Sequence, residues 1–150
     1  MIKQAVYFAY GANLNKGDMG YRCPGAKPIG AATIKDQRLI FRGVADIEPA
    51  PGETVHGGAW IINEKHLASL DRFEGYPHLY GREWIEIELE SGEKRQALVY
   101  RMTSRTGTAR PNRSYLTAIA EGYTDFGLPH SNLVEAVALS MAREEGRQTG

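Results

Sequence analysis

A glutamate near the end of a predicted helix carries the strongest chemical signal in this sequence. Glu74 lies within residues 70–77, which read LDRFEGYP. The negative end of the helix dipole, the charge of Asp71 and the aromatic surface of Phe73 and Tyr76 all favour its neutral form, so they raise its pKa. A carboxyl group tuned in this way can accept and return a proton near neutral pH, as general base and acid catalysis requires.

The same segment allows a plainer interpretation. Glu74 could point to solvent and pair with Arg72 or Arg82. Structural ion pairs perturb pKa values just as catalytic sites do, so residues 70–77 leave both interpretations open.

A second feature of interest is the loop that follows the first apolar stretch. Residues 7–15 read YFAYGANLN, and the apolar run stops abruptly at Gly11. No strand candidate follows at once, so a tight hairpin is disfavoured. Successive backbone N–H groups after a strand can bind a carboxylate or a developing oxyanion, and glycine permits the necessary bend. The loop therefore predicts an anion-binding element.

Other catalytic patterns are absent from the sequence. No pair of histidines has the spacing of a metal site, and the glycines of YGANLNKG match neither a phosphate-binding nor a dinucleotide-binding loop. Cys23 could be a nucleophile, but nothing in the sequence supplies it with a base. We interpret it as a buried structural cysteine.

The apolar pattern predicts strands in the first two thirds of the chain. The expected strands cover residues 5–10, 31–41, 44–48, 55–62, 84–89 and 96–102, the last two forming a hairpin. Glycine and proline predict an irregular segment at 15–30 and a turn at 49–52. Asn63 has the residue type of an N-cap, and it opens a predicted helix that ends near Gly75.

Helices are expected at the end of the chain. A polar loop at 104–113 precedes a predicted helix at 114–123. The last helix is expected to open near Asn132, where Glu135 completes a capping pattern, and to stop at Gly146. Strands first and helices late indicate an α+β domain with a strongly curved or barrel-like sheet.

Length and composition narrow the function further. The 150 residues fit one domain, 1–150, and the 18 basic and 18 acidic residues cancel. We therefore expect neither nucleic acid nor an anionic membrane as a partner. No apolar run approaches a membrane span, and one cysteine permits no internal disulfide, so we expect the cytoplasm. The sequence carries no signal for the oligomeric state.

Taken together, these motifs resemble those of the gamma-glutamyl cyclotransferase-like family. The marks are a strand-ending Tyr-Gly-x-Asn-Leu loop and a downstream Glu-Gly, here Tyr10-Gly11-Ala12-Asn13-Leu14 and Glu74-Gly75. Further similar segments include MGYRCPGA at 19–26 and RLIFRGVADIEPAPGETVHGGAW at 38–60. The resemblance covers nearly the whole chain. Ala12 departs from it, since many relatives have serine there.

The resemblance implies a small mixed β-barrel flanked by helices, with no metal and no organic cofactor. It implies an enzyme that releases 5-oxoproline from a small γ-glutamyl substrate. Glu74 would be the catalytic acid and base. The substrate-binding residues would be Tyr10, Gly11, Ala12, Asn13, Leu14, Tyr80, Tyr100 and Tyr115.

Two alternatives to this function stay open. One is a non-catalytic binding module that kept the pocket. The other is an enzyme that removes a γ-glutamyl group from a larger biosynthetic amine.

Overall fold

Five strands, four α-helices and a short 3-10 turn make up the described part of the chain. The computed structural model describes residues 3–104 and 107–149. In chain order the elements are β1 (Ala5–Ala9), η1 (Ala12–Leu14), α1 (Lys16–Arg22), β2 (Lys27–Arg42), β3 (Val44–Ile62), α2 (Glu64–Glu74), β4 (Tyr80–Leu89), β5 (Lys94–Met102), α3 (Arg113–Phe126) and α4 (His130–Thr149).

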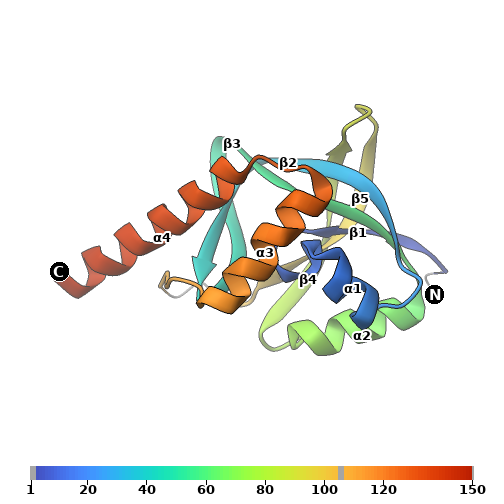
Figure 1. Cartoon of the computed structure of the whole chain (residues 1–150), viewed down its shortest axis with the longest axis horizontal. Helices are drawn as coiled ribbons and strands as arrows, with labels where there is room; N and C mark the ends of the chain where they lie inside the picture. Colours follow the sequence, from blue (N-terminus) through green and yellow to red (C-terminus); the bar gives the residue numbers. More distant parts are fainter. Residues whose placement is uncertain (1–2, 105–106, 150) are drawn as a thin grey trace.

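The five described strands close into a barrel in the order β1-β3-β2-β4-β5. Neighbouring strands are antiparallel except for β1 and β5, which pair in parallel through Tyr7 and Leu98 and close the barrel. The helices lie around this sheet, with α3 crossing beside η1 and α1, and α2 below them in Figure 1. The expected α+β fold with a small mixed barrel and flanking helices is confirmed.

The longest pairing in the barrel is the β2–β3 hairpin, which turns at Gly43. The predicted turn at residues 49–52 is wrong, because this segment continues β3. Its extra residues are absorbed by a register shift between Lys35 and Gln37, and the Gly52 N–H donates to Asp36 Oδ1 at 2.9 Å. Such a bulge lets a strand pass proline and glycine without ending its pairing.

Residues 15–30 are also more regular than the sequence indicates. They contain α1 and the start of β2, so the expected irregular segment is wrong. Gly17 and Gly20 weaken the helical signal. Two features compensate: the Asn15 side chain accepts the Asp18 N–H at 3.0 Å, and Met19 is fully buried in the core.

The ends of the helices agree with the sequence in α2 and differ in α4. Asn63 caps α2, and Gly75 ends it in the left-handed conformation, both as predicted. By contrast, α4 begins at His130 rather than near Asn132, and it continues past Gly146 to Thr149. One glycine in an exposed helix costs only about 1 kcal/mol, which does not end it.

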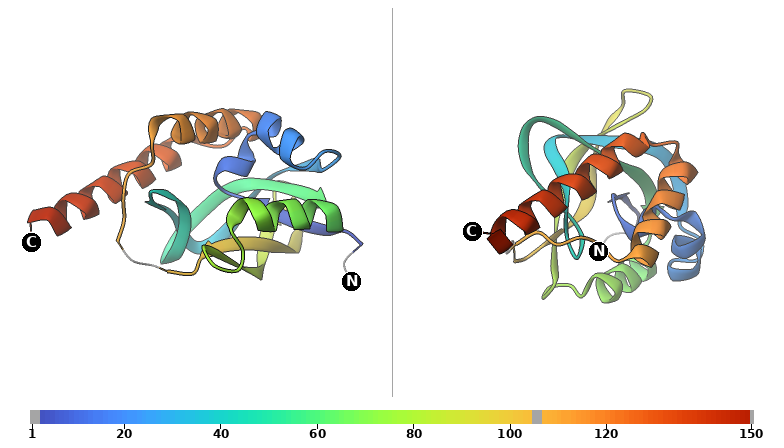
Figure 2. Two further views of the ribbon diagram at one scale, coloured as in Figure 1. Left: turned by 90° about the horizontal axis from the view of Figure 1, so that it is seen from below. Right: turned by 60° about the vertical axis from the view of Figure 1, so that its left-hand side comes forward.

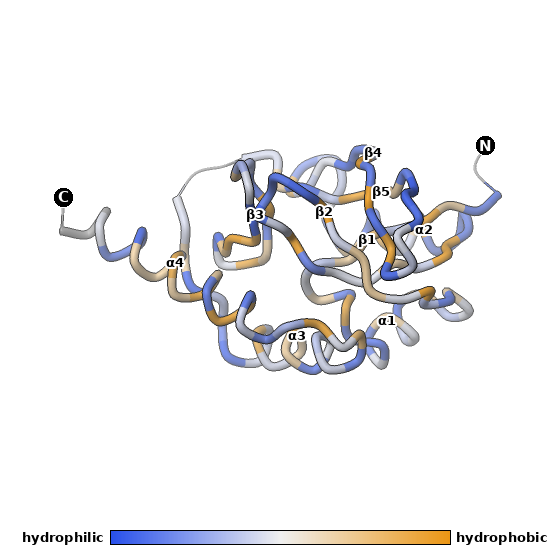
Figure 3. Tube along the Cα trace, turned by 90° about the horizontal axis from the view of Figure 1, so that it is seen from above, coloured by the Kyte–Doolittle hydropathy of each residue, from blue (hydrophilic) through white to orange (hydrophobic). Residues whose placement is uncertain are grey.

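The outer half of α4 extends away from the barrel (Figure 2), while its first half packs on β2. Figure 3 shows hydrophilic residues interrupting the apolar ones along this helix. Among the described residues, no helix combines the length and the apolar character needed to cross a bilayer.

A close approach between α3 and the last residue of η1 fixes the end of the loop after β1. A Cβ atom at Gly122 of α3 would lie 2.5 Å from Leu14 Cβ and 2.6 Å from the Leu14 carbonyl carbon. Only glycine allows this distance without a shift of backbone.

We therefore expect Gly122→Ala to lower the free energy of unfolding by about 1–3 kcal/mol, since the new methyl group overpacks the contact. Gly20→Ala, with nothing within 4 Å of the added atom, is the matched control and raises stability by up to about 1 kcal/mol. Urea denaturation measures both. A Gly122→Ala protein as stable as the wild type would contradict the contact.

Candidate active site

A pocket opens between the loop after β1 and the end of α2. It has a volume of about 340 Å³, counting the space open to solvent at its mouth. The lining residues come from six segments of the fold and are Tyr7, Phe8, Tyr10, Gly11, Ala12, Asn13, Ala45, Phe73, Glu74, Tyr80, Tyr100 and Tyr115. All the residues predicted for the site except Leu14 are among them.

Glu74 is the last residue of α2 and is half-buried in the wall of the pocket. Burial raises the pKa of its carboxyl group to about 7, and the positive charge of Arg22 opposes part of this rise. The predicted direction of the pKa shift is therefore confirmed. At neutral pH the group divides between its acid and base forms, as a proton carrier must.

Asp71 does not act on Glu74 as the sequence analysis expects. Its carboxylate accepts the Tyr100 hydroxyl at 2.6 Å and pairs with Arg82. The like charge that was expected beside Glu74 is thus neutralised elsewhere. This pair also occupies Arg82, while Arg72 contacts Ser69, so the ion pair proposed as the plainer interpretation of Glu74 is not present.

The loop opposite Glu74 is the 3-10 turn η1. Gly11 precedes it with φ −129° and ψ −127°, and a Cβ atom there would lie 3.0 Å from Ala45 Cβ and 3.3 Å from Tyr115 Oη. Close packing against the pocket wall, rather than a positive φ, therefore favours glycine at this position. The first N–H groups of a helical turn have no partner within the turn, so they can bind an anion.

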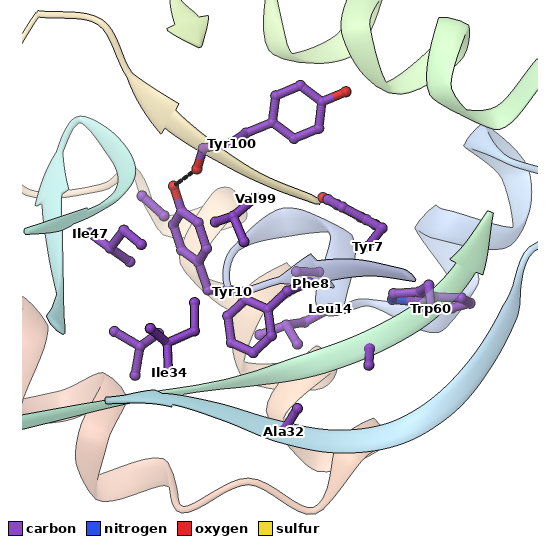
Figure 4. Packing of buried hydrophobic residues seen from close by; sticks show 14 of the residues in the cluster. Tyr7, Phe8, Tyr10, Leu14, Ala32, Ile34, Ile47, Trp60, Val99 and Tyr100 are labelled. Atoms are coloured by element: carbon purple, nitrogen blue, oxygen red, sulfur yellow. Dashed lines mark hydrogen bonds between the residues drawn. The ribbon is translucent and has the colours of Figure 1, made fainter. Parts of the chain in front are cut away.

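Leu14 is the exception among the predicted binding residues. Its side chain is fully buried in the core (Figure 4), and it does not line the pocket. It packs against Gly122 of α3. The expectation that Leu14 contacts a ligand is therefore corrected. Its role in this structure is to anchor the loop by burying an apolar side chain.

Asn13 connects the loop to Glu74. Its Nδ2 donates to Tyr7 Oη at 3.0 Å and to Glu74 Oε1 at 3.5 Å, and its Oδ1 accepts from Arg22. Neither Arg22 nor Tyr7 is among the site residues predicted from the sequence. Arg22 lies only nine residues beyond Asn13, but this spacing does not predict a contact. The contact depends on the path of α1, which ends at Arg22.

Hydrogen bonds divide the tyrosines of the pocket into two groups. Three of them donate their hydroxyl protons to acceptors within the protein. Tyr10 donates to Tyr100 O at 2.7 Å, Tyr80 to Ala45 O at 2.5 Å, and Tyr100 to Asp71 Oδ1 at 2.6 Å. Figure 4 shows the first of these bonds, from Tyr10 directly after β1 to Tyr100 in β5.

The hydroxyls of Tyr7 and Tyr115 instead accept hydrogen bonds, from Asn13 Nδ2 and from the Ala45 N–H at 3.0 Å. Within the described residues neither hydroxyl donates. Burial also raises the pKa of Tyr115 to about 12, so it keeps its proton at neutral pH. These two side chains can therefore donate to a ligand.

Cys23 is buried, and burial raises the pKa of its thiol, so it is a poor nucleophile. Its Sγ contacts His66 O at 3.7 Å, in agreement with the predicted structural role. Within residues 3–104 and 107–149, no three His, Cys, Asp or Glu side chains form a group that could hold a metal ion.

Residues 7–122 match the family model described as gamma-glutamyl cyclotransferase, AIG2-like. Similar curated proteins are gamma-glutamylcyclotransferases of Bos taurus and Homo sapiens, 30% and 31% identical over 137 residues. Each alignment covers 83% of this chain and 72% of the relative.

A solved structure of a gamma-glutamyl cyclotransferase superposes with a TM-score of 0.81 at 27% identity, over 89% of this chain and 86% of that one. The family model spans more than half of the sequence and includes every segment that lines the pocket. The chain belongs to the gamma-glutamyl cyclotransferase, AIG2-like family and is an enzyme of the gamma-glutamyl cyclotransferase type.

Proposed function

We propose that this enzyme cyclises the γ-glutamyl group of a small γ-glutamyl amino acid or amine to 5-oxoproline and releases the free amine. The observation that carries the proposal is the position of Glu74. This carboxyl group has a pKa of about 7 and faces the amide-bearing loop across one pocket. The reaction needs a group that both accepts and donates a proton, and a site for negative charge.

Glu74 begins the reaction as a base. The substrate's α-amine has a pKa of about 8, so it is mostly protonated at neutral pH and cannot attack. The Glu74 carboxylate takes one proton from it. The freed amine then forms a bond to the γ-carbonyl carbon of the same molecule, which closes a five-membered ring. Since both reacting groups belong to one substrate, holding them in position supplies much of the rate.

Breakdown of the intermediate uses Glu74 as an acid. The protonated Glu74 donates to the leaving nitrogen and takes the surplus proton from the ring nitrogen. The bond between the γ-carbon and the leaving nitrogen breaks as the carbonyl reforms. The released amine picks up the remaining proton from Glu74, which restores the carboxylate for the next turnover.

Negative charge in the substrate is bound by the loop in this proposal. The N–H groups of Gly11, Ala12 and Asn13 and the Tyr115 hydroxyl provide donors for the α-carboxylate and for the oxygen of the tetrahedral intermediate. Ala12 lacks a side-chain donor, so the loop acts through its backbone at this position. Tyr10, Tyr80 and Tyr100 shape the pocket, since their protons are used within the protein.

We also propose that the enzyme acts in the cytoplasm. Cys23 is a free thiol with an exposed fraction of 1%, which fits a reducing compartment.

The proposed reaction is tested with a panel of γ-glutamyl amino acids and γ-glutamyl amines, with 5-oxoproline as the measured product. We expect turnover of at least one of them, and a fall in kcat of about 10²- to 10⁴-fold in Glu74→Gln, because the amide cannot carry the proton. Glu64→Gln changes an exposed carboxylate at the other end of α2 and serves as the matched control with unchanged kcat.

Other outcomes of this panel separate the alternatives. Tight calorimetric binding of a γ-glutamyl compound without any product would show a binding module and refute the enzyme reaction. Turnover confined to large γ-glutamyl amines would show the deprotecting function. Full activity in Glu74→Gln would refute the proposed base.

A second prediction separates the two tyrosines that contact Ala45. Tyr115→Phe removes a hydroxyl whose proton is available to the substrate, so we expect kcat/KM to fall by about 100-fold. Tyr80→Phe removes a hydroxyl that donates to Ala45 O. It therefore loses stability but less than about threefold in kcat/KM. Equal losses in the two variants would show that the Tyr115 hydroxyl only supports the pocket wall.

A further inference from the structure

Arg22 contacts the proposed site from outside the pocket. It is the last residue of α1, and its guanidinium group donates to Asn13 Oδ1. The same group stacks on the Phe73 ring, with Cζ 3.5 Å from the ring centroid. Phe73 directly precedes Glu74, so Arg22 touches both sides of the proposed site. It does not line the pocket itself.

The chemistry of the guanidinium group decides how the Asn13 amide is oriented. Arginine has donors and no acceptor, so it can bind only the amide oxygen. With Oδ1 held by Arg22, Nδ2 must face the other way, toward Tyr7 Oη at 3.0 Å and Glu74 Oε1 at 3.5 Å. A reversed amide would place its oxygen against the Glu74 carboxylate, which repels it.

The backbone directly after Arg22 is held against α2. These contacts fix the position from which the Arg22 side chain extends. Cys23 Sγ contacts His66 O at 3.7 Å, and His66 Nε2 lies 2.6 Å from Pro24 O. His66 also completes the capping box of α2 with Asn63. The same helix therefore carries Glu74 at its end and anchors the residues next to Arg22 at its start.

We propose that Arg22 is a positioning residue that fixes the polarity of the hydrogen-bond chain from Arg22 through Asn13 to Tyr7 and Glu74. The inference rests on the proposed function of Glu74. In this arrangement the Tyr7 hydroxyl accepts from Asn13 and keeps its own proton for a ligand. The Glu74 carboxylate receives one N–H group, which favours the ionised form that the reaction needs.

Arg22 also supplies positive charge to a site made mostly of neutral groups. The charge of Arg22 acts on Glu74 to favour its ionised form. Asp71 on the same helix is paired with Arg82, and Arg72 is exposed. The titratable groups that face Glu74 from the neighbouring strands and from α3 are Tyr7, Tyr10, Tyr80 and Tyr115.

The experiment is a titration of the Glu74 carboxyl carbon by NMR, with Glu74→Gln used to assign the signal. We expect Arg22→Met to raise the titration midpoint by about one pH unit, because it removes both the charge and the amide anchor. In the γ-glutamyl assay, kcat falls about tenfold at neutral pH while KM changes less than about twofold. Arg72→Met removes an exposed arginine from α2 and is the matched control, in which we expect the titration midpoint and kcat to stay unchanged.

Arg22→Lys separates orientation from charge. Lysine keeps the charge but lacks the planar group that stacks and donates in one geometry. We expect a titration midpoint within about 0.3 unit of the wild type and a partial loss of kcat. In an Asn13→Ala background, Arg22→Lys should have no further effect on kcat, since the chain it acts through is gone.

The proposal is overturned if Arg22→Met leaves the midpoint and kcat unchanged, or raises only KM, which would place Arg22 on the substrate. If Arg22→Met does not fold, Arg22→Lys decides, and wild-type kcat in that variant refutes the positioning role. The titration does not require turnover. A shifted midpoint in a protein that turns over no substrate would therefore support the inference and refute the proposed function separately.

Discussion

Burial of the Glu74 carboxyl group is the physical constraint on which the site depends. Removing a carboxylate from water raises its pKa, here to about 7, and each polar contact that favours the charge lowers it again. Glu74 has one long hydrogen bond from Asn13 and the field of Arg22. Several strong partners would return the pKa of Glu74 to an ordinary carboxyl range. Without any partner, the carboxyl group would stay protonated at neutral pH.

Glu48 shows how the same fold treats a structural carboxylate. Arg38, Arg42 and Arg143 all contact it, and hydrogen bonds from Arg143 and Arg38 lower its pKa to about 2. These contacts join α4 to the β2–β3 hairpin. The difference between Glu48 and Glu74 lies first in their charged donors, since three arginines contact Glu48 and Glu74 makes no such ion pair within the described residues. It distinguishes a residue that holds elements together from one that can exchange a proton.

The parts of the fold that the sequence predicts are those with strong local signals. Strand β1, the β4–β5 hairpin and α2 follow from apolar runs, alternation and the Asn63 cap. The two motifs around Gly11 and Glu74 predict the residues that the structure brings to one pocket. The predictions failed where tertiary contacts outweigh local signals. Helix α1 forms despite two glycines, residues 49–52 pass through a bulge, and α4 continues through Gly146.

The role of Glu74 as the base is tested by the pH dependence of kcat/KM for a γ-glutamyl substrate. The base must be ionised, so activity should fall about tenfold per pH unit below the Glu74 pKa of about 7. A profile that stays level down to the ordinary glutamate pKa of 4.5 would contradict the claim that burial prepares Glu74 for catalysis.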